Sequence, residues 1–132
     1  MEILILSAGK LGTRVAEALC EGNHSITIID QSSDVINRIN QQLDVLTVHG
    51  DGRESKLLKD LKISNFDFFI ALTNSDETNI ITASMAKKMG AKMVMARVRD
   101  PEYMNQMDMI KESFGIDITL NPDLAITNEI YK

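Results

Sequence analysis

The sequence contains a single cysteine, Cys20, which excludes an internal disulfide and favours a reducing compartment. No apolar run approaches the ~20 residues that a helix needs to cross a bilayer. The amino terminus also lacks the basic flank and the cleavage site of a secretory signal. We therefore expect a cytoplasmic chain that does not insert into a membrane.

Positive charge is also scarce. The 14 Lys and Arg residues face 19 Asp and Glu residues, so the formal net charge is −5 at pH 7. Proteins that bind nucleic acids carry clustered basic side chains, because phosphate contacts dominate their affinity. No cluster here is longer than Lys87-Lys88, so no nucleic-acid partner is predicted. With 132 residues, 44% of them hydrophobic, the chain is the size of one globular domain.

Six short segments rich in Ile, Val and Leu alternate with segments of helical spacing. The expected strands are residues 3–6, 26–29, 45–48, 68–72, 93–96 and 116–120. Their nearly continuous hydrophobicity is typical of strands that are covered on both faces of a parallel sheet. Regular alternation of strand and helix predicts a single-domain α/β fold, with a Rossmann-type doubly wound parallel sheet of six strands.

Polar residues and one proline mark where several helices should begin. Ser32 precedes the second helix, and Ser75 or Asp76 precedes the fourth, so these side chains are the expected N-caps. Pro101 suits the first turn of the following helix. One apolar stripe is expected to run along that helix, through Tyr103, Met107, Ile110 and Phe114.

A glycine-rich segment, Ser7-Ala8-Gly9-Lys10-Leu11-Gly12, directly follows the first expected strand. It fits the dinucleotide fingerprint G-x-G-x-x-G except at Ser7. A serine with a negative φ would still form the tight turn at this position, and its hydroxyl would contact phosphate. Gly9 would let the backbone approach a pyrophosphate, and Gly12 would let the helix pack closely on the strand. Lys10 would reach a terminal phosphate or remain solvated. The helix start and its dipole favour bound phosphate.

An acidic residue, Asp30, ends the second expected strand, 30 − 12 = 18 residues after Gly12. A carboxylate at this position would accept hydrogen bonds from ribose hydroxyls and repel a 2′-phosphate. Gln31 follows it in place of an arginine, so NADP is disfavoured. In the alternative interpretation, the glycines only form a tight turn and Asp30 merely ends a strand.

Further polar residues follow the later strands, on the edge where open α/β sheets bind ligands. Asp51 would bond the adenine or ribose of a nucleotide, and Thr73 and Asn74 would line its phosphate or ribose. Arg97 would pair with phosphate through its guanidinium group. Each has a structural alternative: Asp51 as a turn former, residues 75–77 as helix caps, and Arg97 as a surface ion pair.

Metal and catalytic signatures are missing from this sequence. His24 and His49 have no Cys or acidic partner at ligand spacing, so neither a metal site nor a catalytic residue is predicted. An excised cofactor domain of an NAD-dependent oxidoreductase is the alternative function. It would need another domain to present a substrate.

The loop, Asp30 and two longer motifs together resemble the N-terminal domain of the TrkA/RCK (KTN) regulators of potassium transport. The motifs are Ala-Leu-Thr-Asn-Ser-Asp-Glu-Thr-Asn at 71–79 and Ala-Arg-Val-Arg-Asp-Pro-Glu-Tyr at 96–103. The resemblance implies a regulator that binds NAD(H) or ATP/ADP. Its ligand would be held by the residues named above: Ser7, Ala8, Gly9, Lys10, Leu11, Asp30, Thr73, Asn74 and Arg97.

The resemblance also implies an assembly. Such regulators form dimers that build rings, and they contact a membrane potassium transporter or channel subunit at the inner face of the cell membrane. Residues 1–120 would form the Rossmann domain, and residues 121–132 would begin a crossover helix into the dimer partner. The apolar residues that exceed one buried stripe, at 103–114 and 125–131, would supply the subunit contact.

Overall fold

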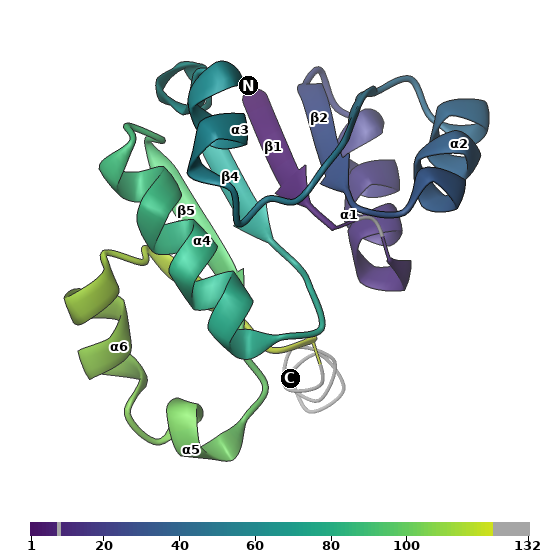
Figure 1. Ribbon diagram of the computed structural model, residues 1–132. Coiled ribbons are helices and arrows are strands. Elements are labelled where there is room, and N and C mark those ends of the chain that lie inside the picture. Colours follow the sequence, from purple (N-terminus) through teal and green to yellow (C-terminus); the bar gives the residue numbers. More distant parts are fainter. Residues whose placement is uncertain (8, 123–132) are drawn as a thin grey trace.

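The Ile-rich and Leu-rich segments form the six strands expected of them in the computed structural model, which describes residues 1–7 and 9–122 (Figure 1). The strands are β1 (Glu2–Leu6), β2 (Ser25–Asp30), β3 (Leu46–His49), β4 (Phe68–Ala71), β5 (Met93–Arg97) and β6 (Ile118–Leu120). All pairings are parallel, and the strand order is β3-β2-β1-β4-β5-β6. This is the doubly wound Rossmann order, so the predicted fold class is confirmed.

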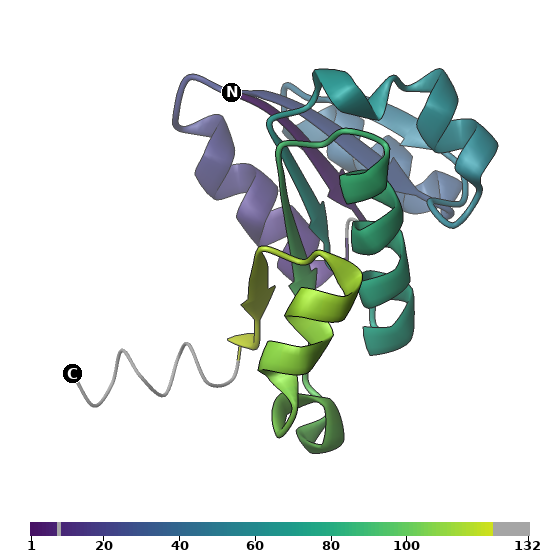
Figure 2. The same cartoon turned by 90° about the vertical axis from the view of Figure 1, so that its left-hand side faces the viewer.

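Helices cover both faces of the sheet. α1 (Lys10–Cys20) and α2 (Ser33–Gln42) pack on one face, while α3 (Ser55–Asp60), α4 (Asp76–Lys88) and α6 (Met107–Phe114) pack on the other. A short 3-10 turn, Ile63–Asn65, follows α3, and α5 (Pro101–Met104) precedes α6. Figure 2 shows α1 and α4 on opposite sides of the strands.

Two apolar clusters form the core, one on each side of the sheet. Along β1, Leu4 and Leu6 join the cluster under α3, α4 and α6, while Ile3 and Ile5 join the cluster under α1 and α2. Successive side chains of a strand point to opposite faces, so a strand buried on both faces must be apolar at every position. All four residues are buried, which explains why β1 has no polar residue after Glu2.

The expected helix starts are confirmed. The Ser32 hydroxyl accepts a hydrogen bond from the Val35 N–H, and the Ser75 hydroxyl accepts one from the Thr78 N–H. These bonds satisfy donors that the first turn of a helix leaves without a partner. Pro101 occupies the first turn of α5.

One expected helix is wrong, because the stripe from Tyr103 to Phe114 belongs to two helices. α5 closes with the Asn105 N–H bonded to the Pro101 carbonyl, and Gln106 leaves the helical region at φ −132° and ψ 35° before α6 begins. After the break, α6 no longer continues the line of α5. Within α6, Ile110 is buried, while Phe114 is 38% exposed. Asn105 has low helix propensity, and neither Asn105 nor Gln106 offers an apolar side chain to hold a continuous helix on the core.

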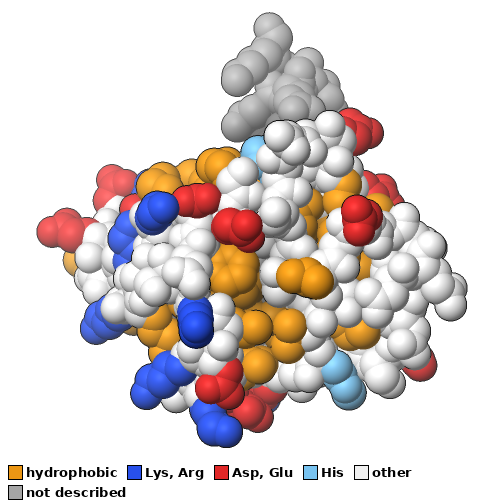
Figure 3. Space-filling model, turned by 90° about the horizontal axis from the view of Figure 1, so that it is seen from above, with side chains coloured by type: hydrophobic (Ala, Val, Ile, Leu, Met, Phe, Trp, Pro, Cys, Tyr) orange, Lys and Arg blue, Asp and Glu red, His pale blue; other side chains and the backbone are white. Residues whose placement is uncertain are grey.

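The amino edge of the sheet is apolar in places and mixed in charge. Figure 3 views the molecule from this side and shows hydrophobic side chains among scattered acidic and basic ones. Met1, Leu46 and Met93, which stand at or just before the starts of strands, are exposed there.

The expected crossover helix at 121–132 lies outside the described residues apart from Asn121 and Pro122. Over the ranges 1–7 and 9–122, none of the helices is long and apolar enough to span a bilayer.

Candidate functional site

The carboxyl edge of the sheet gathers most of the residues that the sequence singles out. Because all strands are parallel, the segments after β1, β2, β3, β4 and β5 meet at this one edge. The chain changes winding direction between β1 and β4, which pair directly in the centre of the sheet. Crevices at such switch points bind ligands in open α/β sheets.

The glycine loop crosses this switch point between β1 and α1. Ser7 has a φ of +83°, so the expected negative φ is wrong, and this serine adopts a conformation that glycine adopts more easily. A Cβ at Gly12 would overlap the Ser7 carbonyl oxygen, which confirms that Gly12 permits close packing of helix on strand. A Cβ at Gly9 would meet no atom within 4 Å, so Gly9 faces open space. Ala8 lies outside the described residues.

A hollow of about 430 Å³ opens against this loop, and we call it the loop hollow. Six predicted site residues line it: Ser7, Gly9, Lys10, Leu11, Asn74 and Arg97. Arg14, Leu72 and Pro122 line it as well. Gly9, Lys10 and Leu11 of this lining belong to the start of α1, where a helix leaves backbone N–H groups without intrahelical acceptors. The loop hollow therefore offers hydrogen-bond donors and positive charge to an anion.

Arg97 and Asn74 form the wall of the loop hollow opposite α1. The Arg97 guanidinium approaches the Asn74 side-chain oxygen at 3.5 Å, and the Arg99 guanidinium donates to the Asn74 carbonyl at 3.2 Å. Asn74 is thereby bonded to two arginines, Arg97 at the end of β5 and Arg99 two residues later. The structure brings Asn74 and Arg97 together with the glycine loop, as a shared phosphate site requires.

Asp30 lies beside the loop hollow, on the β2 side of β1. Its carboxylate accepts the Ser32 N–H at 2.8 Å, and its carbonyl accepts the Gly50 N–H at 3.0 Å. Gln31 is exposed, and its carbonyl accepts a hydrogen bond from His49 Nε2 at 2.8 Å. Neither Asp30 nor Gln31 lines the loop hollow, so the ribose contact of Asp30 and the place of Gln31 in the nucleotide site stay predictions.

Asp51 behaves as the turn former that the sequence allowed. Its carboxylate accepts the Arg53 N–H at 2.9 Å and pairs with the Arg53 guanidinium at 2.7 Å. The hydrogen bond from the Arg53 side chain lowers the pKa of Asp51 below its usual range. Asp51 does not line the loop hollow, so its contact with a nucleotide stays a prediction.

Thr73 is joined to Asn79, a fully buried residue of α4 to which the sequence assigned no separate role. Asn79 Oδ1 accepts from the Thr73 N–H at 2.9 Å and from the Thr73 hydroxyl at 2.6 Å. Asn79 Nδ2 donates to the carbonyls of Thr73 and Arg97, at 3.0 and 2.9 Å. The side chain of Asn79 thus ties the end of β4 to the end of β5 under the loop hollow.

Asp76 fixes the segment after β5 in a similar way. Its carboxylate accepts the N–H groups of Arg99 and Asp100, at 3.0 and 2.7 Å, and its side chain is almost fully buried. The 71–79 motif therefore acts mainly as a scaffold, and of its polar residues Asn74 reaches the loop hollow.

Arg14 is the site residue that sequence reasoning missed. It lies four residues after Lys10 on α1, so helical spacing places both side chains on one face. That spacing is visible in the sequence, but which face of α1 borders the carboxyl edge depends on how α1 packs. Leu72 and Pro122 carry no comparable signal, because apolar residues after a strand are common.

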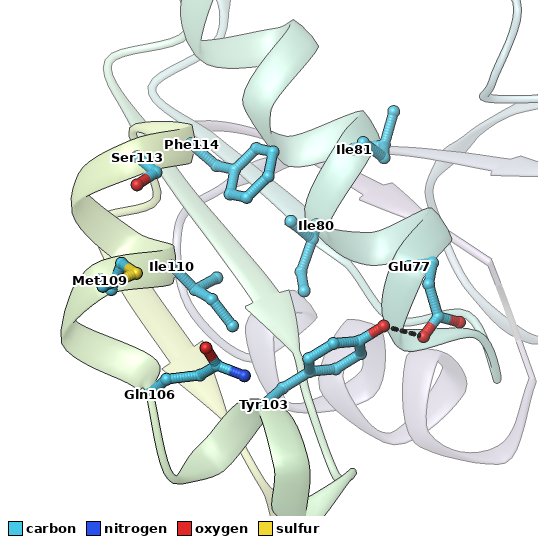
Figure 4. Close-up of a pocket in the computed structure, with 9 residues that line it drawn as sticks. All are labelled: Glu77, Ile80, Ile81, Tyr103, Gln106, Met109, Ile110, Ser113 and Phe114. Atoms are coloured by element: carbon cyan, nitrogen blue, oxygen red, sulfur yellow. Dashed lines mark hydrogen bonds between the residues drawn. The ribbon is translucent and has the colours of Figure 1, made fainter.

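A second hollow, of about 320 Å³, lies between α4 and the α5–α6 pair (Figure 4). We call it the α4–α6 groove, and its lining is Glu77, Ile80, Ile81, Tyr103, Gln106, Met109, Ile110, Ser113 and Phe114. Ile80, Ile110 and Phe114 point into it, and the Tyr103 hydroxyl donates to Glu77 at 2.6 Å across one end. That hydrogen bond lowers the pKa of Glu77 and raises the pKa of Tyr103.

Comparison with known proteins identifies the relatives of this chain. The TrkA-N domain family matches residues 3–122. The Trk system potassium uptake protein TrkA homolog of Archaeoglobus fulgidus is 34% identical over 129 residues, which are 98% of this chain and 29% of that protein. The chain therefore spans under a third of the length of this relative.

Solved structures with low sequence identity share the fold. The TrkA-N domain of the inner membrane protein ybaL from Escherichia coli superimposes with a TM-score of 0.83 at 14% identity, covering 98% of this chain and 93% of that one. The GsuK channel bound to NAD superimposes with a TM-score of 0.76 at 18% identity, covering 92% of this chain and 21% of that one. GsuK has also been solved bound to ADP, with a TM-score of 0.75, 18% identity, and coverage of 91% and 31%.

Proposed function

The chain belongs to the TrkA-N domain family, and on that premise we propose that it is a regulatory nucleotide-binding domain of a potassium-uptake system. Its ligand would be an adenine nucleotide, NAD(H) or ATP/ADP, and its readout would be the activity of a membrane potassium transporter or channel. The domain would act through conformation and subunit contacts at the inner face of the membrane, without catalysing a reaction. Relatives named as potassium uptake proteins and a channel solved with NAD and with ADP support this proposal.

The observation that carries the proposal is the loop hollow. It joins the start of α1, the Asn74 wall and three cationic side chains, Lys10, Arg14 and Arg97, at the switch point of the sheet. Helix N-termini and arginine side chains both stabilise phosphate. Asp30, one strand away at the end of β2, would hold the ribose, and the phosphates would bridge from there to α1. Rossmann domains recognise adenine dinucleotides in this arrangement.

A binding measurement with one substitution tests this proposal. We expect NAD, ADP or ATP to bind the wild-type chain, and Asp30→Ala to weaken binding by about 1–3 kcal/mol, because ribose hydroxyls would lose a charged acceptor. Isothermal titration calorimetry measures both affinities. NADP should bind more weakly than NAD, because its 2′-phosphate would face a carboxylate.

The control for that experiment is Asp44→Ala, the same truncation at an exposed position before β3, on the opposite edge of the sheet. Thermal unfolding of both variants must show a folded protein, since Asp30 also holds the Ser32 N–H. Unchanged affinity in folded Asp30→Ala would remove the ribose role. An absence of binding by every nucleotide would refute the proposed function.

A second copy of the chain is the partner that the α4–α6 groove would contact. On its rim, Ile81 is 49% exposed and Met109 is 67% exposed, which is unusual for apolar side chains this large. A two-fold axis near this rim would let the apolar rim of each subunit cover that of the other, as self-complementary dimer interfaces do. The chain would then transmit nucleotide binding to its neighbour.

We expect sedimentation of the wild-type chain to show at least a dimer at roughly micromolar to millimolar concentration, where weak contacts become populated. Ile81→Asp should shift this equilibrium to monomer, because it places a charge in the apolar contact. Leu46→Asp is the control. It introduces the same charge at a residue that is 72% exposed on β3, the edge strand at the other end of the sheet from β6. A wild-type monomer at all concentrations, or equal behaviour of the two variants, would contradict this interface.

A further inference from the structure

The charge of the loop hollow bears on which adenine nucleotide fits it, an inference that rests on the proposed function. Lys10 and Arg14 contribute from α1, and Arg97 contributes from the end of β5. No Asp or Glu is among the described residues that line the hollow. Three positive side chains in a lining that holds no Asp or Glu create a local field that favours a ligand carrying several negative charges.

Lys10 and Arg14 are poorly placed for the stability of α1 itself. The first turn of α1 contains no acidic residue, and its positive dipole end repels the Lys10 ammonium. Like charges four residues apart on a helix also destabilise it slightly. Within the ranges 1–7 and 9–122, neither side chain forms a hydrogen bond or an ion pair that would offset this repulsion. A polyanionic ligand would offset it.

The strand order decides which half of a nucleotide meets these cations. Asp30 lies at the end of β2, whereas the loop hollow lies beyond β1 against β4 and β5. A nucleotide with its ribose at Asp30 and its first phosphate at the start of α1 would extend its remaining part into the hollow. In NAD⁺ this part ends in a second ribose and a positively charged nicotinamide ring. In ADP and ATP it consists of further phosphates.

We infer that the site takes adenine nucleotides ending in a phosphate chain, ADP or ATP, in preference to NAD⁺ and NADH, and that Arg14 is a specificity-determining residue that contacts the terminal phosphate. The guanidinium group suits this role because its planar donors bind two phosphate oxygens at once. Arg14 lies one helical turn beyond Lys10, farther from the start of α1, so it is placed for the phosphates that follow the first one.

The test measures the affinity of the wild-type chain, Arg14→Ala and Lys56→Ala for AMP, ADP, ATP, NAD⁺ and NADH. Calorimetry in EDTA keeps divalent cations from changing the charge of the ligands. We expect wild-type affinity for ADP and ATP to exceed that for NAD⁺ and NADH by about tenfold or more. Arg14→Ala should weaken ADP and ATP by about five- to tenfold, a range reduced for an exposed arginine, and change AMP, NAD⁺ and NADH by less than about twofold.

The control, Lys56→Ala, removes one positive charge at an exposed position on α3, outside the loop hollow, and should leave all five affinities unchanged. Binding of NAD⁺ or NADH as tight as ADP, or an equal loss for all ligands in Arg14→Ala, would overturn this inference while leaving the proposed nucleotide site in place. An absence of binding by all five nucleotides would instead refute the proposed function and this inference together.

Discussion

Gly12→Ala is expected to lower the free energy of unfolding by about 3 kcal/mol, the upper end of the usual range for overpacking, because the atoms it meets cannot move away. The added Cβ would overlap the Ser7 carbonyl oxygen, which is backbone, so relief requires α1 to move away from β1. Alanine favours a helix by at most about 1 kcal/mol over glycine, so the steric cost decides the sign. Urea or thermal unfolding, followed by circular dichroism, measures the loss.

Gly9→Ala is the matched variant, because the same chemical change three residues earlier meets open space. Gly9 has a φ of −65°, which alanine adopts without strain, and it is the N-cap of α1. Its unfolding free energy should change by under about 1 kcal/mol, since alanine is only a poorer N-cap than glycine. Its nucleotide affinity should fall, because the methyl group enters the space beside the loop. Equal stabilities of the two variants would contradict the close packing at Gly12.

Asn79→Ala is expected to cost about 2–4 kcal/mol of unfolding free energy, because it removes four hydrogen bonds and leaves their partners in a partly buried site. The N–H and hydroxyl of Thr73 would lose an acceptor, and the carbonyls of Thr73 and Arg97 would lose a donor. The ends of β4 and β5 would then separate more easily. Folded Asn79→Ala should therefore also bind nucleotide more weakly, since Arg97 and Asn74 line the loop hollow from these ends.

Two further variants test this account of Asn79. Asn79→Asp keeps the acceptor but places a carboxylate oxygen against two carbonyl oxygens, so we expect it to be at least as destabilising as alanine. Asn105→Ala makes the same truncation at an exposed residue and should change the unfolding free energy by less than about 0.5 kcal/mol. A loss below about 1 kcal/mol in Asn79→Ala would show that the buried network contributes little.

Local sequence pattern predicts most of the elements of this fold. Strands buried on both faces must be apolar throughout, and helices on a sheet must repeat their apolar residues at helical spacing, so both leave a signal within a few residues. The α5–α6 break shows the limit of that signal. The stripe from Tyr103 to Phe114 keeps helical spacing across a turn, because two helices packed on one core produce nearly the same pattern as one.

The edge that carries the site also followed from the sequence, since residues after parallel strands must share one edge. Which of them face the same hollow did not follow. Asn74 lines the loop hollow while its neighbour Thr73 turns to Asn79, and a sequence does not distinguish two adjacent polar residues in a loop. The positive φ of Ser7 is likewise imposed by the surroundings, because serine has no intrinsic preference for it.

The sequence by itself therefore determined the six strands and the parallel sheet, because each rests on neighbouring residues and backbone geometry, and it also predicts that the loop after β1 binds phosphate. The tertiary structure alone decided that Arg14 joins Lys10 and Arg97, and that Asn79 ties β4 to β5. Residues up to 97 − 10 = 87 positions apart thus share one hollow, and only the strand order and the packing of α1 and α4 bring such residues together.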